Sequence, residues 1–304
     1  MMTRSESTRI GLGMMRIATL EPNQIRDLYH GAREAGVKLF DHADVYGGGE
    51  HGCERLFGEA LELSSSEREQ IVLQTKCGIR PGVPGFDFSA EHIIRRAEES
   101  LEALRTEYLD VLLLHRPDTL VEPEEVAQAF DALESSGKVR SFGVSNHTPR
   151  QIDLLKMNVS QPLKVNQVQF GLGHAALVAQ GVAANMEGLE QSTNRDGGLL
   201  EYSRINGITL QAWSPYQRGF FNGLIFDHPE LSKLHRVLDK LSKEYATTPT
   251  SIATAWITRH PAKMEVIVGT TKASRLHEAV AGAEITLTRA EWYELFEAAG
   301  YQIP

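Results

Sequence analysis

Residues 109–115 read LDVLLLH, a nearly continuous apolar run that ends in a histidine. Successive side chains of a strand point to opposite faces of the sheet, so a run without alternation predicts a strand that is covered on both faces. Parallel strands packed between helices have this pattern. The run therefore predicts a buried parallel sheet.

Seven more apolar runs of this kind occur along the chain, and amphipathic stretches that predict helices alternate with them. The runs are IGLGMM from residue 10, VKLFD from 37, IVLQTK from 71, VRSFGVS from 139, LKVNQVQ from 163, ITLQAWS from 208 and VIVGT from 266. The predicted helices are 23–35, 50–63, 90–104, 123–136, 149–157, 198–206, 229–245 with 249–260, and 274–283.

Eight β/α units in 304 residues predict a closed (β/α)8 barrel, the TIM-barrel architecture, rather than an open sheet. No linker-like composition interrupts the units, so we predict that residues 1–304 form a single catalytic domain. A further helix is predicted at 289–299, and we expect it to pack across the barrel as a C-terminal extension.

The composition narrows the classes of partner. The formal net charge is −9 and the basic residues are scattered, which argues against a nucleic-acid or membrane surface. The two cysteines, Cys53 and Cys77, have no CxxC spacing, so we expect neither a disulfide framework nor a bound metal. The N-terminal residues carry no apolar signal segment and no window reaches the length of a membrane span. We therefore expect a cytoplasmic monomer that acts on a small molecule.

Two segments have more than one interpretation. Residues 47–52 (GGGEHG) fit the G-x-G-x-x-G pattern, but Gln74-Thr75-Lys76 stand where a dinucleotide fingerprint needs an acidic residue, which favours a flexible turn beside the active site. Residues 171–197 are unusually long for a connection between a strand and its helix. This loop either shapes a pocket on the catalytic face or is a decorative insertion.

Polar residues follow four neighbouring strands at the edge where barrel enzymes assemble their sites. Asp41 ends the second predicted strand and Tyr46 follows it, Lys76 ends the third, and His115 ends the fourth. Ser145-Asn146 end the fifth strand. Taken singly, each of the first four has an ordinary structural explanation, but together they predict one catalytic group.

These residue types favour proton transfer to a substrate carbonyl. A free tyrosine has a pKa of about 10, and a nearby Lys76 ammonium favours its phenolate and lowers that pKa. Asp41 is expected to hold Lys76 in place and keep it charged. His115 can donate a hydrogen bond to the carbonyl, so Tyr46 and His115 would stabilise the negative charge that develops on oxygen.

With these residues identified, the chain resembles the aldo-keto reductase superfamily nearly from end to end, in particular a bacterial branch whose substrates are unassigned. The resemblance rests on FDHADVYG at 40–47, LQTKCG at 73–78, LDVLLLHRPD at 109–118, GKVRSFGVSN at 137–146, VNQVQ at 165–169, AWSP at 212–215 and GTTKASRLHE at 269–278. It implies an NADPH-dependent reductase of aldehydes or ketones, with Asp41, Tyr46, Lys76 and His115 as the catalytic tetrad.

The resemblance also implies residues that bind NADPH and NADP⁺. Ser145, Asn146 and Gln167 would hold the nicotinamide carboxamide, and Trp213 would stack on its ring beside Ser214. The loop Gly269, Thr271 and Lys272 opens a helix, where backbone N–H groups suit a phosphate. The remaining implied contacts are Lys272 and Arg275 to the 2′-phosphate and Glu278 to the adenine. Residues 216–221 depart from the glycine-rich stretch of relatives, and we expect this segment still to fold over the pyrophosphate, with Arg218 as a phosphate partner. Relatives carry a lysine where Gly269 stands and an asparagine where Ala279 stands.

Several questions stay open at the level of sequence. An NADPH-binding, redox-sensing regulatory subunit with little turnover is an alternative to the reductase, and a metal-dependent barrel enzyme is a third class. Arg116 and Asp118 either contact substrate or brace the barrel rim, and Phe220 and Phe221 either line the pocket or pack. The substrate depends on residues 171–197, 216–226 and the C-terminal tail, whose shapes a sequence does not specify.

Overall fold

The computed structural model of the protein describes residues 8–219 and 222–304, so Phe220 and Phe221 lie outside the described residues. In the described part of the chain, eight strands follow one another in chain order around a closed barrel. They are β1 (Ile10–Gly13), β2 (Leu39–Asp41), β3 (Val72–Cys77), β4 (Val111–Leu114), β5 (Phe142–Ser145), β6 (Leu163–Gln169), β7 (Thr209–Trp213) and β8 (Glu265–Val268). Each strand overlaps one predicted apolar run, and the predicted (β/α)8 barrel is confirmed.

Every predicted helix is present, with ends that differ by a few residues. The helices are α1 (Pro22–Glu34), α2 (Gly52–Leu61), α3 (Ser65–Arg68), α4 (Ala90–Ala103), α5 (Pro123–Ser135), α6 (Pro149–Leu155), α7 (Ala176–Val182), α8 (Leu199–Ile205), α9 (Ser232–Glu244), α10 (Pro249–Thr258), α11 (Ala273–Ala283) and α12 (Arg289–Ala298). The sequence did not predict α3 or α7, and α7 lies inside the long segment 171–197.

Local capping explains where several helices begin. The Ser89 hydroxyl accepts a hydrogen bond from the His92 N–H at the start of α4, and a capping box of Thr288 and Glu291 opens α12. Proline occupies the first turn of α1, α5, α6 and α10. These positions satisfy or avoid the unpaired N–H groups of a helix N-terminus.

The run that predicted the sheet behaves as expected for a strand covered on both faces. Leu112, Leu113 and Leu114 are successive residues of β4, and all three are fully buried. Because neighbouring residues of a strand point to opposite faces, both faces of β4 are out of water.

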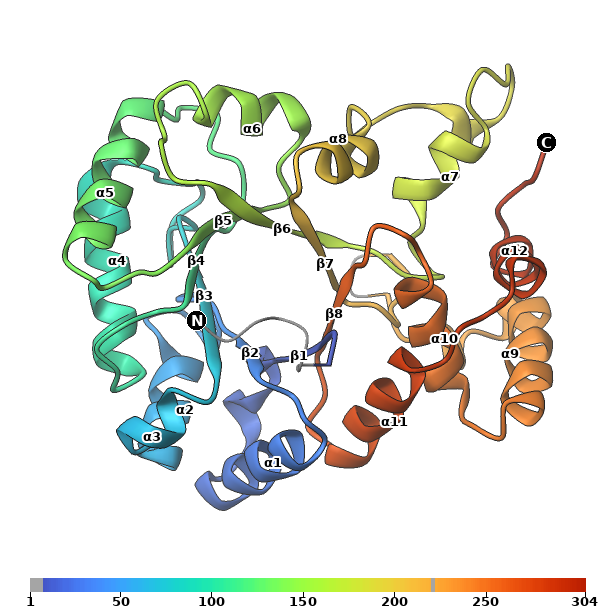
Figure 1. Cartoon of the computed structure of the whole chain (residues 1–304), viewed down its shortest axis with the longest axis horizontal. Helices are drawn as coiled ribbons and strands as arrows, with labels where there is room; N and C mark the ends of the chain where they lie inside the picture. The colour runs from blue at the N-terminus through green and yellow to red at the C-terminus, as the bar shows by residue number, and fades with distance from the viewer. Residues whose placement is uncertain (1–7, 220–221) are drawn as a thin grey trace. The chain divides into compact units, whose positions relative to one another are not determined.

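The chain divides into two compact units. The first contains residues 11–167 and 269–273, and in it α1, α2, α4 and α5 lie on the outer side of β2 to β5 (Figure 1). The strands of this unit pair in parallel, with Asp41 opposite Gln74 and Lys76 opposite Leu113. The carboxyl ends of β2 to β5 therefore lie at the same edge of the sheet.

The second unit contains residues 8–10, 168–268 and 274–304. Its strands β7 and β8 pair in parallel, with Trp213 opposite Ile267. The C-terminal helix α12 packs against α9 and α10, where we had expected it to cross the barrel. The reason is a pair of stacked indoles, Trp256 and Trp292, each of which donates its ring N–H to the other's backbone carbonyl.

Candidate active site

Four side chains of the first unit, Asp41, Tyr46, Lys76 and His115, come together as the sequence predicted. Lys76 is at their centre, because its Nζ lies 2.8 and 2.7 Å from the two carboxylate oxygens of Asp41 and 3.3 Å from the Tyr46 hydroxyl. The ammonium also donates to the His42 carbonyl at 2.7 Å. These contacts leave Lys76 only 1% exposed, and they place a fixed positive charge beside the phenol.

The position of Tyr46 depends on a glycine-rich turn. Gly47, Gly48 and Gly49 have φ values of 82, 94 and 86°, a backbone region that disfavours other residues. A Cβ at Gly47 would stand 2.8 Å from the Cys53 nitrogen. The Cys53 N–H donates to the Tyr46 carbonyl at 3.0 Å, so the chain folds back directly after Tyr46 to begin α2. The glycines thus form a turn beside the site, as predicted, and the turn is tight.

His115 follows β4 and faces the phenol. Its ring centroid lies 5.9 Å from that of Tyr46, with the two planes at 82°. Burial, with the nearby charges of Lys76 and Arg116, holds the pKa of His115 well below its usual range. The imidazole is therefore neutral at physiological pH, and a neutral ring carries one N–H that can donate a hydrogen bond.

The protonation of the Lys76–Tyr46 pair differs in part from the expectation. Burial lowers the pKa of Lys76, but Asp41 and Tyr46 outweigh it, so the net pKa is raised and the amine stays charged as predicted. For Tyr46, burial raises the pKa more than Lys76 lowers it. The predicted net lowering of this pKa is wrong, because loss of hydration around the phenol is the larger effect. Tyr46 is thus a neutral phenol that carries a proton.

Asp41 receives more hydrogen bonds than the sequence suggested. Gln74 and Gln167 each donate a side-chain N–H to Asp41 Oδ1, at 2.7 and 2.8 Å. Gln74 was missed, although a polar residue two positions before Lys76 on a buried strand shares its face of the sheet and was a usable signal. Three donors therefore converge on one carboxylate oxygen.

Ser145 and Asn146 lie directly after β5 and are linked to the same edge. The Ser145 hydroxyl donates to the Gln167 carbonyl at 2.8 Å. Asn146 has a left-handed backbone with φ 60°, and its side-chain amide donates to His115 O at 3.2 Å and Ser145 Oγ at 2.9 Å. The two residues thus connect the ends of β4, β5 and β6.

The predicted phosphate loop lies between β8 and α11. The Lys272 N–H bonds to the Thr270 hydroxyl at 3.1 Å, which forms a small turn, and Gly269, Thr271 and Lys272 are exposed. A Cβ at Gly269 would lie 3.9 Å from Arg16 Nε, so the exposed guanidinium of Arg16 reaches this loop. The sequence did not point to Arg16, because it stands far from the loop along the chain.

The other predicted cofactor residues belong to the second unit. Trp213 ends β7 and is partly exposed, and Ser214 follows it with a left-handed φ of 48°. Arg218 forms an ion pair with Glu230. The exposed Arg275 and the partly buried Glu278 lie on α11, and the Glu278 carbonyl accepts a hydrogen bond from Ser251 at 2.8 Å.

Two residues with open roles follow His115. Asp118 accepts hydrogen bonds from the Phe88 N–H at 3.1 Å and the Leu120 N–H at 2.9 Å, so it braces the loops beside β4. Arg116 is partly buried, and burial lowers its pKa while the nearby Tyr46 raises it. The charge of Arg116 also helps to lower the pKa of the neighbouring His115.

Two further features concern residues 8–219 and 222–304. In that part of the chain, no three His, Cys, Asp or Glu side chains are grouped so that they could hold a metal ion. None of its helices combines the length and the apolar character that crossing a membrane requires.

Comparisons with known proteins show which sequences and structures the chain is similar to. Residues 9–299 match the model of the Aldo/keto reductase family. The chain is 38% identical to "Uncharacterized oxidoreductase YcsN" of Bacillus subtilis over 280 residues. The matched region covers 88% of this chain and 86% of that protein. It is 32% identical to "6-dehydroglucose reductase" of Agrobacterium fabrum, over 97% of this chain and 95% of that one. An aldo-keto reductase of Klebsiella pneumoniae, solved in complex with NADPH, has the same fold, with a TM-score of 0.76 at 22% identity and coverage of 98% and 92%.

Proposed function

Because the chain belongs to the aldo-keto reductase family and is thus an oxidoreductase, we propose that it reduces an aldehyde or ketone with NADPH, and that Tyr46 supplies the proton. The observation that carries the proposal is the contact of the buried pair Asp41 and Lys76 with the partly buried Tyr46. The Lys76 ammonium is held by both oxygens of Asp41 and touches the Tyr46 hydroxyl. A fixed cation beside a neutral phenol is the arrangement that releases a proton to a carbonyl oxygen.

Each of the four residues has a different role in the proposed reduction. His115, as a neutral donor, binds and orients the carbonyl oxygen, and Tyr46 gives its proton to that oxygen as the carbonyl carbon receives a hydride. Lys76 then stabilises the phenolate left on Tyr46, and Asp41 keeps Lys76 in place. When bound, NADPH supplies the hydride and becomes NADP⁺. The product is an alcohol, and a proton from solvent restores Tyr46.

The donors in the chain suit a nicotinamide dinucleotide phosphate. Amide and hydroxyl groups of Ser145, Asn146 and Gln167 match a carboxamide, and the partly exposed indole of Trp213, next to Ser214, matches an aromatic ring. In the described part of the chain, the exposed Lys272 and Arg275 side chains form no ion pair, so they are available to a 2′-phosphate. The proposed set is completed by Gly269, Thr271, Glu278 and Arg218, and Arg218 would have to leave Glu230 to reach a phosphate.

Titration with NADPH and NADH, followed by tryptophan fluorescence, tests the cofactor. We expect NADPH to bind more tightly than NADH, and the Lys272→Met variant to lose most of this preference. The oxidation of NADPH is then followed with a panel of aldehydes and ketones, which includes 6-dehydroglucose because one relative carries that name. Turnover with any of them supports the reductase, while tight binding of NADPH without turnover favours the alternative of a redox-sensing regulatory subunit. Binding of neither nucleotide contradicts both.

A further inference from the structure

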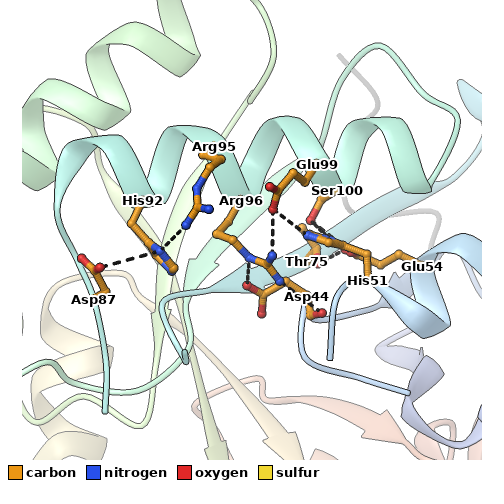
Figure 2. Close-up of polar contacts among 10 residues, drawn as sticks. All are labelled: Asp44, His51, Glu54, Thr75, Asp87, His92, Arg95, Arg96, Glu99 and Ser100. Carbon is orange, nitrogen blue, oxygen red and sulfur yellow. Dashed lines mark hydrogen bonds and ion pairs between the residues drawn. The ribbon is translucent and has the colours of Figure 1, made fainter. Parts of the chain in front are cut away.

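A network of charged side chains links Asp44 and His51, which stand on either side of Tyr46 in the sequence, to helix α4 (Figure 2). Arg96, on α4, donates from Nε to Asp44 Oδ2 at 2.8 Å and from Nη1 to Glu99 Oε2 at 2.7 Å. The same Glu99 oxygen lies 3.2 Å from His51 Nε2, and His51 Nδ1 bonds to Glu54. Asp44, His51, Glu54 and Arg96 are all buried, so the network is an internal feature of the first unit.

The network holds the Tyr46 turn at two places. Asp44 stands two residues before Tyr46 and His51 stands five residues after it, and both side chains connect to α4 through Arg96 and Glu99. The backbone closes the turn between them, because the His51 N–H donates to the Asp44 carbonyl at 2.8 Å. Every residue between Asp44 and His51 therefore sits in a loop whose two ends are fixed to one helix.

The same network reaches the strand that carries Lys76. Glu54, on α2, accepts a hydrogen bond from the Thr75 hydroxyl on β3, next to Lys76. The Asp44 N–H donates to the Lys76 carbonyl at 3.0 Å. Both members of the proton-donating pair are thus fixed to the network, Tyr46 through its turn and Lys76 through its neighbours.

The network places acidic side chains directly against Arg96 and His51. Three carboxylates face the Arg96 guanidinium and the His51 ring, and each nitrogen of that ring lies against a carboxylate oxygen. Buried ion pairs of this kind contribute little net stability compared with apolar residues of similar size, and are better suited to fixing one arrangement. The Ser100 hydroxyl also contacts His51 and Glu54, and it shares the ring nitrogen Nδ1 of His51 with Glu54. Because Ser100 is only 1% exposed, a substrate cannot reach its hydroxyl, and Ser100 is not a nucleophile.

We propose that Asp44, Arg96, Glu99, His51 and Glu54 form a positioning network that holds the Tyr46 hydroxyl against the Lys76 ammonium. The proposal rests on the proposed reductase function, which makes this contact the proton donor. In the folded protein, loss of Arg96 frees Asp44 from α4 and removes the cation that holds Glu99 against His51. The turn is then attached to α4 only at His51, and the distance from Tyr46 to Lys76 is less closely fixed.

Helix α4 offers matched control variants. Arg96→Gln removes the link between Asp44 and Glu99, and Arg95→Gln removes the neighbouring exposed arginine, whose contact is with His92. Glu99→Gln neutralises a partly exposed member of the network, and Glu98→Gln neutralises the adjacent acid, which pairs with Lys138 outside it. Arg96→Lys keeps a positive charge but reaches one carboxylate at a time.

Two readouts separate positioning from simple structural support. The first is kcat and KM per folded molecule: we expect Arg96→Gln to lower kcat roughly 10- to 100-fold with KM within about two-fold, because small displacements of a reacting group have such effects. The kcat of Arg96→Lys should lie between those of the wild type and Arg96→Gln, and the kcat of Glu99→Gln should be a few-fold lower than that of the wild type. The two controls, Arg95→Gln and Glu98→Gln, should have the kcat of the wild type. The second is the NMR signal of ¹³Cζ-labelled Tyr46, assigned with Tyr46→Phe, which should shift in Arg96→Gln and stay unchanged in Arg95→Gln.

The outcomes that overturn the proposal are distinct from those that overturn the reductase. A folded Arg96→Gln protein with the kcat and the Tyr46 signal of the wild type contradicts the network, as does a change of equal size in Arg95→Gln. If Arg96→Gln does not fold, the Glu99→Gln variant provides the test. An unchanged NMR signal of Tyr46 in Glu99→Gln then contradicts the proposed network. A wild type that reduces no carbonyl contradicts the proposed function alone, because the Tyr46 signal still reports whether the network holds the phenol.

Discussion

At the scale of single residues, the site is organised around the charge of Lys76. The ammonium and Asp41 are both buried, and they form an ion pair in which each carboxylate oxygen accepts a hydrogen bond from Nζ. Removing one partner of a buried pair leaves an uncompensated charge, whereas replacing both partners with neutral groups removes the problem. Stability and catalysis should therefore respond differently to the two kinds of change.

We predict that Lys76→Met lowers the free energy of unfolding by about 3–5 kcal/mol, because Asp41 is then buried without its cation. The double variant Asp41→Asn with Lys76→Met should recover most of that loss, and neither protein should turn over substrate. Urea unfolding at pH 7 measures the first effect, and NADPH oxidation measures the second. A double variant that is as unstable as the single one would show that the charge of Asp41 is not the cause.

The sequence was sufficient to predict that these four side chains lie close together, and insufficient to predict their environment. The positions of Asp41, Lys76 and His115 could be predicted because each ends a predicted strand, and the ends of parallel strands meet at one edge. The net pKa of Tyr46 could not, because it depends on how much water the folded chain removes from the phenol. Arg16 could not either, because its approach to Gly269 exists only after the barrel has closed.

At the scale of elements, the turn from β2 to α2 determines where Tyr46 lies. Gly47 and Gly48 both have positive φ, but they differ in their surroundings. A Cβ at Gly47 would stand 2.8 Å from the Cys53 nitrogen and 3.0 Å from its Sγ, while one at Gly48 meets nothing within 4 Å. An alanine at either position would therefore have a strained backbone, but only an alanine at Gly47 would also clash with Cys53.

We expect Gly48→Ala to cost about 1 kcal/mol of stability, the strain of a left-handed alanine, and to leave kcat close to that of the wild type. Gly47→Ala adds the clash with the first turn of α2, so it should cost more and should also lower kcat, because the turn must shift at Tyr46. Thermal unfolding and steady-state kinetics of both variants test this. Equal effects of the two alanines on kcat would contradict it.

Element prediction succeeded where the hydrophobic period was clear. All eight strands were predicted because each contains closely spaced aliphatic or aromatic residues, although β3 and β6 also carry polar residues. Helix α3 was missed because four residues are too few to show a period. Helix α7 was missed because its seven residues lie between Gly173 and Gly188 in a stretch with no polar face.

At the scale of the whole molecule, several buried histidines make stability depend on pH. Burial lowers the pKa of His42 to about 4, and it lowers the pKa of His147 to about 4. Both rings take up protons more readily when the chain unfolds, so they contribute stability above their unfolded pKa of about 6.5 that is lost as the pH falls towards 4. Asp44 opposes this, because burial raises its pKa to about 6 and its contribution is lost as the pH rises from about 4 to 6.

We predict that the free energy of unfolding falls between pH 6.5 and 4, because the histidines outnumber the opposing acid. His42→Leu should reduce the fall by an amount on the order of 3 kcal/mol, since a change of one pKa unit corresponds to about 1.4 kcal/mol. The substitution also suits the site, because neither ring nitrogen of His42 has a partner in the described structure and the ring packs edge-on against Phe57. Urea unfolding of both proteins at pH 7 and 4.5 tests this. A difference in the free energy of unfolding between the two pH values that is the same in His42→Leu as in the wild type would contradict it.

The most direct test of the central claim, that Tyr46 donates the proton in an NADPH-dependent carbonyl reduction, is the rate of NADPH oxidation in the wild type and in Tyr46→Phe. The substrate is a carbonyl compound that the wild type reduces, and NADPH affinity is measured in parallel. We predict that removing one hydroxyl lowers turnover by roughly 10²- to 10⁴-fold and leaves NADPH affinity unchanged. Turnover by Tyr46→Phe at the rate of the wild type would contradict the account.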